Sequence, residues 1–302
     1  MRGTRSQFPG SGRASQIRLP AASQCSPTAP GRWVRQTARV RLATWNVNSV
    51  RARLPRLLDW LGTAAPDVVC LQETKCDDGQ FPTAALAEAG YASASHGTGR
   101  WNGVALLSRV GLADVTPGLP GAPGFPDVQP RYLEATCGGV RVASLYVPNG
   151  RTLADPAYPY KLAWLAALRE HLSRQLAADP ALPLVVAGDW NIAPLDTDVW
   201  DIAVFAGATH VSQPERDALQ VLRDLGLRDL LAEHRPAGTF TYWDYRQGMF
   251  RRGMGMRIDH LLATAPVADA TREAWVDVEA RRGTGASDHA PVVVQLELPA
   301  PA

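Results

Sequence analysis

Six short polar clusters in the sequence carry the side-chain types that hydrolysis of a phosphate ester requires. An anionic phosphate must be polarised by a hard cation with oxygen ligands, and Glu73 with Asn46 supplies such ligands. Each cluster sits at the end of an apolar run, and strand ends along one edge of a sandwich bring distant segments together. The clusters are TWNVN (44–48), QETK (72–75), YVPNG (146–150), GDWN (188–191), RIDH (257–260) and SDHAP (287–291). A charged loop would explain any one of them, but their repetition indicates a site.

Hydrolysis also needs a group that deprotonates the attacking water and groups that hold the phosphate oxygens. Asp189 or His289 could activate the water, and the sequence leaves this choice open. Asp259 could orient His289 by fixing its tautomer. Amides and hydroxyls can hold phosphate oxygens without adding a repelling charge. The candidates for that role are Tyr146, Asn149 and Asn191. His210 and His260 are expected to be structural or solvated.

The apolar pattern between the clusters predicts one catalytic domain over residues 39–302. Short apolar runs at 67–71, 140–147 and 184–187 are typical of buried strands, and leucines recur at helical spacing over 160–176. Strands and helices mix without a strict βαβ rhythm, and short Gly/Pro turns link several strand pairs. The sequence therefore predicts an α/β fold with two packed mixed β-sheets and helices outside, a four-layer α-β-β-α sandwich. Trp45 and Trp190 are expected to be core aromatics at strand ends.

Charge is distributed unevenly along the 302 residues. The chain has a formal net charge of +2, yet residues 1–41 hold eight arginines and no acid, which leaves −6 on the remainder. A net-negative body is compatible with a nuclease where carboxylates gather around a metal ion. Residues 1–38 lack periodicity and are predicted to form a disordered basic segment. A DNA-binding arm, a targeting segment and a misassigned translation start all remain open for it.

Cysteine spacing and hydropathy favour a cytoplasmic protein. None of the four cysteines (Cys25, Cys70, Cys76 and Cys137) forms a CxxC pair, and no apolar leader precedes them, so we expect them to be reduced. No apolar run approaches the roughly 18 residues that a membrane-spanning helix needs. The sequence carries no signal for oligomerisation, and we expect a monomer.

The clusters, taken in order, resemble the exonuclease III family of abasic-site endonucleases, a branch of the endonuclease/exonuclease/phosphatase superfamily. SDHAPV and GDWN alone would indicate only the superfamily, whereas LQETK, YVPNG and YWDYR point to the DNA-repair branch. The resemblance spans about residues 40–298. Its segments are TWNVNSVRAR (44–53), LQETK (71–75), WNGVALLSR (101–109), YVPNG (146–150), GDWNIAP (188–194), FTYWDYR (240–246), RIDHLL (257–262) and SDHAPV (287–292).

This resemblance implies Mg²⁺-dependent hydrolysis of double-stranded DNA 5′ to abasic sites, with Mn²⁺ as a second possible metal and with 3′-5′ exonuclease and 3′-end cleaning activity. Asn46 and Glu73 resemble the metal-binding pair, and Asp288 resembles a residue near the metal. The implied catalytic residues are Tyr146, Asp189, Asn191, Asp259 and His289. The implied DNA-binding residues are Asn149, Arg151, Tyr242, Trp243, Arg246, Met256 and Ile258. Such an enzyme would be nucleoid-associated while bound to DNA.

The segment 240–258 interleaves aromatic side chains with arginines, which suits a DNA backbone and an unstacked nucleotide. By resemblance, Tyr242, Met256 and Ile258 would line an apolar pocket for a flipped-out abasic sugar, and Arg257 is among the arginines expected near DNA. A mobile basic loop is the alternative. Asn48 departs from the family, since many relatives carry an acid there, and this difference is expected to alter metal affinity.

Two other functions fit parts of the pattern. An enzyme of the same superfamily could act on a phospholipid or an inositol phosphate, although YWDYR and RIDHLL argue against it. A catalytically silent nucleic-acid-binding protein could use the same scaffold, although no expected catalytic position is lost.

Overall fold

The computed structural model describes residues 37–125 and 127–299. The predicted disordered segment therefore lies outside the described residues, apart from Thr37 and Ala38. These two residues belong to the first strand, β1 (Thr37–Asn46), so the sheet starts just before the domain boundary predicted at residue 39. Cys70, Cys76 and Cys137 are free and buried, as expected for reduced cysteines.

Twelve strands among the described residues form two six-stranded sheets. Sheet one has the order β11-β12-β1-β2-β4-β3, and sheet two has the order β5-β6-β7-β8-β10-β9. The pairs β1–β2 and β7–β8 are parallel, while their other neighbours are antiparallel. Both sheets are therefore mixed, as predicted. The strands after β1 are β2 (Val68–Gln72), β3 (Ala92–His96), β4 (Val104–Ser108), β5 (Ala113–Pro117), β6 (Tyr132–Cys137), β7 (Val140–Tyr146), β8 (Leu184–Asp189), β9 (Arg228–Asp229), β10 (Asp259–Ala263), β11 (Thr271–Val276) and β12 (Val292–Pro299).

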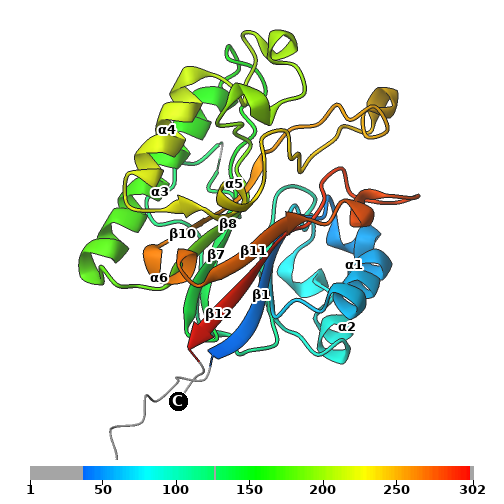
Figure 1. The fold of residues 1–302 in the computed structure, drawn as a ribbon, viewed down its shortest axis with the longest axis vertical. Helices are drawn as coiled ribbons and strands as arrows, with labels where there is room; N and C mark the ends of the chain where they lie inside the picture. The colour runs from blue at the N-terminus through cyan, green and yellow to red at the C-terminus, as the bar shows by residue number, and fades with distance from the viewer. Residues whose placement is uncertain (1–36, 126, 300–302) are drawn as a thin grey trace, which may run out of the picture. The chain divides into compact units, whose positions relative to one another are not determined.

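Helices cover the outer faces of both sheets (Figure 1). Helices α1 (Val50–Ala64) and α2 (Thr83–Glu88) lie beside sheet one, and α3 (Ala157–Ala178) and α4 (Gln213–Arg223) lie beside sheet two. The short helices α5 (Leu230–His234) and α6 (Ala265–Ala268) contribute to the core between the sheets. The helix expected over 160–176 is α3, which extends beyond that range at both ends.

Three apolar layers account for the four-layer sandwich. Strand β8 shows the pattern, because Val185 and Ala187 pack between the sheets while Leu184 and Val186 face α3 and α4. A strand that is buried on both faces reads as a continuous apolar run, which is why 184–187 was identifiable in the sequence. Sheet one does the same against α1 and α2. Among the described residues, no helix is long and apolar enough to cross a membrane.

Candidate active site

The ends of β1, β2, β7 and β8 meet around one pocket of about 240 Å³. Register places them together, since Asn46 pairs with Gln72 across β1 and β2, and Tyr146 pairs with Asp189 across β7 and β8. All residues that line the pocket, except His210, belong to the predicted site. They are Glu73, Tyr146, Asn149, Asp189, Asn191, His210, Tyr242, Met256, Ile258, Asp288 and His289.

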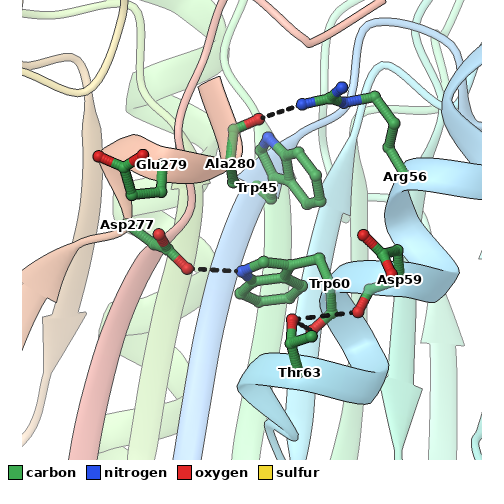
Figure 2. Close-up of a pocket in the computed structure, with 8 residues that line it drawn as sticks. All are labelled: Trp45, Arg56, Asp59, Trp60, Thr63, Asp277, Glu279 and Ala280. Atoms are coloured by element: carbon green, nitrogen blue, oxygen red, sulfur yellow. Dashed lines mark hydrogen bonds between the residues drawn. The ribbon is translucent and has the colours of Figure 1, made fainter. Parts of the chain in front are cut away.

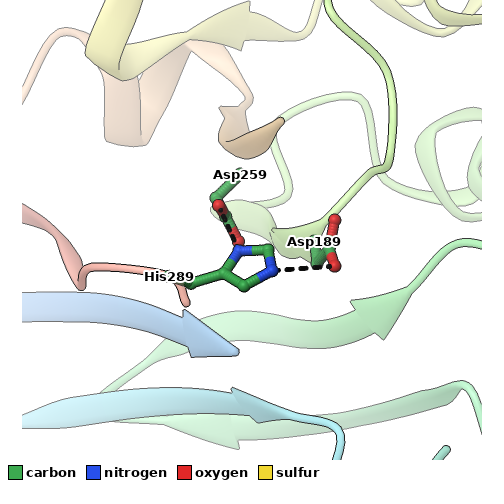
Figure 3. Close-up of side chains that lie close together, drawn as sticks. All are labelled: Asp189, Asp259 and His289. Carbon is green, nitrogen blue, oxygen red and sulfur yellow. Dashed lines mark hydrogen bonds and ion pairs between the residues drawn. The ribbon is translucent and has the colours of Figure 1, made fainter. Parts of the chain in front are cut away.

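The imidazole of His289 lies between two carboxylates (Figure 3). Its Nδ1 is 2.8 Å from Oδ2 of Asp259, and its Nε2 is 3.8 Å from Oδ2 of Asp189. Asp259 and Asp189 pair directly across the antiparallel strands β10 and β8, which fixes the spacing between the two acids. The structure thus places Asp259 where it can orient His289, as the sequence suggested.

The two carboxylates change the acid–base properties of the cluster. Burial by itself lowers the pKa of His289, but Asp259 and Asp189 stabilise the imidazolium and raise the pKa to about 10. Burial raises the pKa of Asp189 to about 7, an increase that the positive His289 opposes and Asp259 reinforces. The two carboxylates therefore favour the imidazolium form of His289, and burial favours the protonated form of Asp189.

Asn46 joins two carboxylates at the floor of the site. Its Nδ2 donates to Oε1 of Glu73 at 2.8 Å and to Oδ2 of Asp189 at 2.9 Å. Burial alone would raise the pKa of Glu73, but Lys75 and Asn46 outweigh it and lower the pKa. Nζ of Lys75 lies 2.6 Å from Oε2 of Glu73. The Glu73 carboxylate therefore lines the pocket and also forms an ion pair with Lys75.

Asp288 belongs to the same polar chain. Nδ2 of Asn48 donates to Oδ1 of Asp288 at 3.1 Å, and Oδ1 of Asn48 accepts from Nζ of Lys75 at 2.6 Å. Lys75 in turn pairs with Glu73, so Asn48 connects the two carboxylates that were expected near a metal. Their oxygen atoms are the ligand type that a hard divalent cation prefers.

The opposite side of the pocket is built from amides. Nδ2 of Asn149 donates to Oδ1 of Asn191 at 3.1 Å, and Nδ2 of Asn191 donates to the carbonyl of Val147 at 3.0 Å. The backbone N–H of Asn191 donates to Oδ1 of Asp189 at 3.0 Å. Asn191 and Glu73 both have a left-handed backbone with φ of 51°, which asparagine tolerates but which costs free energy at a glutamate.

An apolar wall closes the third side. The rings of Tyr242 and His289 lie 4.8 Å apart, and the backbone of Tyr242 bridges to both Met256 and His289. Met256 and Ile258 belong to a separate buried apolar cluster against which Tyr242 packs. The three residues predicted to contact an abasic sugar are therefore adjacent to the acid–base cluster.

Comparison with known proteins shows the family. The family model described as Endonuclease/Exonuclease/phosphatase family matches residues 43–289, a range that contains every predicted site residue. This chain belongs to that family. It is 30% identical over 274 residues to exodeoxyribonuclease III of Haemophilus influenzae, an alignment that covers 85% of this chain and 100% of that protein.

Solved structures of family members show the same architecture. The 3′ phosphatase NExo from Neisseria, bound to product DNA hairpin, is 41% identical with a TM-score of 0.81, and 85% of this chain covers 99% of that one. An AP endonuclease from Archaeoglobus fulgidus is 33% identical with a TM-score of 0.80 at the same coverage. The two sheets and outer helices described above thus form the family's sandwich.

Two family-motif residues have other surroundings than expected. Trp243 is only 6% exposed and packs edge-on against Phe250 at 5.2 Å between ring centroids, so its indole holds the loop together and does not face solvent. Arg257 is buried and binds Asp198 at 2.8 Å and Asp229 at 2.6 Å, so its guanidinium is not available to a DNA backbone. Both side chains were expected near DNA.

Two arginines do face solvent near the pocket's loops. The side chain of Arg246 is 82% exposed and pairs with Asp244 at 2.6 Å. The side chain of Arg151 is 69% exposed and lies 3.6 Å from Asp155. Neither lines the pocket among the described residues.

His210 is the pocket residue that sequence reasoning missed. Its Nε2 lies 3.1 Å from Oδ1 of Asn191 and 3.2 Å from Nδ2 of Asn149. It stands in a loop outside all six polar clusters, so no motif marked it. His260, by contrast, is fully buried, and its Nε2 contacts the Ile192 carbonyl at 2.9 Å, as a structural histidine would.

A tryptophan pair on the helix-covered side of sheet one supports the backbone of His289. Nε1 of Trp45 donates to the His289 carbonyl at 3.1 Å, and Trp45 packs edge-on against Trp60 at 5.3 Å. Nε1 of Trp60 donates to Asp277 at 2.8 Å in a second pocket, drawn in Figure 2. Nε1 of Trp190 likewise donates to the His260 carbonyl. Trp45 and Trp190 are therefore confirmed as core residues at strand ends.

Proposed function

We propose that this chain is a metal-dependent DNA-repair nuclease that hydrolyses the backbone 5′ to abasic sites, with 3′-5′ exonuclease and 3′-end cleaning activity. One observation carries the proposal: the apolar wall of Tyr242, Met256 and Ile258 lies in the same pocket as Asp189 and His289. A sugar without a base suits the wall, while the acid–base cluster reaches its 5′ phosphate. Relatives named exodeoxyribonuclease III and AP endonuclease support this assignment.

We propose separate roles for His289 and Asp189, which the directions of their pKa shifts support. His289 is protonated at neutral pH, so its Nε2 donates to a non-bridging phosphate oxygen and stabilises the developing charge. Asp189 accepts a proton from the attacking water. The water oxygen bonds to phosphorus, the P–O3′ bond breaks, and Asp189 can return the proton to the leaving 3′ oxygen. The products are a 3′-hydroxyl and a 5′-phosphate.

The donor set fits a hard divalent cation. Glu73 and Asp288 offer carboxylate oxygens to the pocket, and Asn46 adds a side chain of the same site. Magnesium is the metal we propose, with manganese as a substitute, because both prefer oxygen ligands. When bound, the cation would neutralise phosphate charge and polarise the reacting phosphorus.

A second ion site is available in principle. Asp189, Asp259 and His289 offer ligand atoms within 4.8 Å of one another, and Oδ1 of Asp259 is buried without a hydrogen-bond partner among the described residues. Nδ1 of His289 is already bonded to Asp259, however, so that nitrogen is engaged by the carboxylate. We therefore place the cation at Glu73 and Asp288.

Processing of 3′ ends is a second candidate for the main activity. The Neisseria 3′ phosphatase is more similar to this chain, at 41% identity, than the Archaeoglobus AP endonuclease at 33%. The imidazole of His210 also takes up room in the pocket beside Asn191. A narrower pocket would favour a terminal phosphate over an internal abasic sugar.

The substrate and setting follow from the same features. We propose that the enzyme acts on double-stranded DNA as a monomer, because residues of one chain complete the pocket. A DNA substrate also supports the proposal of a cytoplasmic enzyme that associates with the nucleoid while bound.

The test compares three duplexes: one with an internal abasic site, one with a 3′ phosphate and one undamaged. Incision of the abasic duplex that requires magnesium and stops with chelator supports the proposal. Glu73→Gln, Asp189→Asn and His289→Gln should each reduce turnover by about 100-fold or more while circular dichroism stays unchanged. Removal of the 3′ phosphate without internal incision would establish the second candidate. If all three variants kept wild-type turnover on every duplex, the site would be wrongly assigned.

A further inference from the structure

A fully buried ion pair lies beneath the amide side of the pocket. Lys161 of α3 and Glu215 of α4 pair with both side chains 0% exposed. Neither residue lines the pocket, so neither contacts a substrate bound there. Any effect of the pair on the reaction must therefore act through the groups that it binds.

Lys161 ties down two of the loops that form the pocket. Its Nζ donates to the backbone carbonyls of Asn191 at 2.7 Å and Asn149 at 3.3 Å, in addition to Glu215. An ammonium group has three donors, so all of them are used. Two of the three hold residues whose side-chain amides face the pocket.

Glu215 ties down the third loop. Its Oε1 accepts from the backbone N–H of His210 at 3.0 Å and from the hydroxyl of Thr209 at 2.7 Å. That hydroxyl also lies 3.0 Å from the Asn149 carbonyl, which links the third loop to the first. The other oxygen of Glu215 accepts from the N–H of Ser212 at 3.2 Å and so caps α4.

The three tethered residues meet again through their side chains. Oδ1 of Asn191 lies 3.1 Å from Nδ2 of Asn149 and 3.1 Å from Nε2 of His210. We call the Lys161–Glu215 pair and its hydrogen bonds to the three loops the tether. The atoms around it are closely packed, so the loops have little room to move. Gly150 has φ of +86°, and a Cβ there would lie 2.8 Å from the Thr209 hydroxyl and 3.2 Å from Lys161 Cδ.

Stability alone does not account for such a pair. Removing two charges from water costs several kcal/mol per ion, and apolar residues of similar volume are often as stable or more so. We infer that Lys161 and Glu215 are positioning residues, which fix Asn149 and Asn191 so that their side chains meet the phosphate oxygens in the transition state, and which hold His210 beside them. This inference rests on the proposed function of the pocket.

The principal test is the double variant Lys161→Met/Glu215→Leu, which removes both charges and leaves no unpaired ion. We expect a folded protein with a lower thermal midpoint than the wild type, because the carbonyls and N–H groups that the pair binds lose their partners. Its kcat on the preferred duplex should fall about 100-fold, because a displacement of about 1 Å can cost that much. KM should change much less, since the lost contacts act in the transition state. Glu215→Gln keeps an oxygen acceptor for the same N–H and hydroxyl groups, so its kcat should fall only about tenfold.

Glu134→Gln is the matched control. Glu134 is also a buried carboxylate in an ion pair, with Arg141 at 2.7 Å, and it accepts from the Tyr132 hydroxyl at 2.8 Å. None of its partners lines the pocket. This variant should lower the thermal midpoint and leave kcat unchanged, which separates loss of stability from loss of position.

Hydrogen exchange gives a readout that does not depend on activity. In the double variant, amides in segments 147–151, 189–193 and 208–212 should exchange faster than in the wild type, and those of sheet one should not. If the wild type cuts no DNA, the proposed function fails while this readout still tests the tether. Wild-type kcat and wild-type exchange in the double variant would overturn the inference. Should the double variant not fold, Glu215→Gln is judged by the same two measurements.

Discussion

Nδ1 of His289 lies 2.8 Å from Oδ2 of Asp259, and this contact directs the opposite ring nitrogen into the pocket. Asp259 is the first residue of β10, and the SDHAP segment that carries His289 enters β12. Two separate sheets therefore supply the two partners, and His289 is held where the sheets meet. The acidity of the ring follows from this placement.

Replacement of Asp259 by Asn should lower the pKa of His289. The folded-state pKa is raised to about 10, so the group stabilises the fold below its ordinary pKa of about 6.5, and that contribution is lost as pH rises through 10. Asp259→Asn removes a stabilising charge, and kcat should fall about 100-fold. An NMR titration of the metal-free protein measures the pKa. Asp269→Asn, which removes an exposed carboxylate paired with Arg228, is the control. An unchanged His289 titration would contradict the assigned role.

Removal of the His210 imidazole should change the substrate preference. Burial lowers the pKa of His210 to about 3, and Lys161 adds to this effect, so the ring is neutral and contributes bulk without charge. His210→Ala enlarges the pocket beside Asn191, and the ratio of internal abasic incision to 3′-phosphate removal should rise roughly tenfold. Rates on both duplexes are measured with excess enzyme in single turnover. A parallel fall in both rates would instead make His210 a phosphate contact.

Glu134 should make the free energy of unfolding depend on pH in the acidic range. Burial alone raises its pKa, but hydrogen bonds from His171 and Arg141 outweigh it and lower the pKa from 4.5 to about 2. The linked stabilisation, about 3 kcal/mol, is present above pH 4.5 and is lost as pH falls towards 2. The free energy of unfolding of Glu134→Gln should therefore lie furthest below that of the wild type near pH 7, with the gap closing towards pH 2. Urea titrations at several pH values measure it, with the exposed Glu170→Gln as control. A gap that stays constant with pH would exclude this linkage.

The sequence was sufficient to predict the two sheets and most of the pocket. Strands such as β8 are buried on both faces, so they read as uninterrupted apolar runs. Polar residues at the ends of such runs lie at a shared edge, which is why Glu73, Asp189 and His289 could be grouped before their contacts were known. The apolar runs predict where the strands end, and the strand register places those ends side by side.

Long-range burial was not predictable from the same patterns. Arg257 belongs to a segment that interleaves arginines with aromatics, yet its partner Asp198 lies 59 residues away and draws the guanidinium into the interior. Lys161 reads as a polar position on a helix, but the carbonyls of two remote loops bury it completely. Such groups depend on which loops converge, and neither periodicity nor motif spacing encodes that.

The departure at Asn48 leads to a prediction about metal affinity. Its amide accepts from Lys75 at 2.6 Å and donates to Asp288 at 3.1 Å, so one neutral side chain satisfies a cation and a carboxylate together. Asn48→Asp can still accept from Lys75, but it cannot donate to Asp288. The variant thus places two carboxylates in contact beside Glu73, and a divalent cation would relieve their repulsion.

We expect Asn48→Asp to bind Mg²⁺ about tenfold more tightly and to be less stable than the wild type in chelator. Calorimetric titration with Mg²⁺ measures the affinity, and thermal unfolding with and without metal measures the linked stability. Asn48→Ala is the matched control, because it removes the Asp288 bond without adding charge and should bind no more tightly. Equal affinities for the wild type and Asn48→Asp would place the cation away from Asp288, and the cluster of Asp189, Asp259 and His289 would then be its next candidate site.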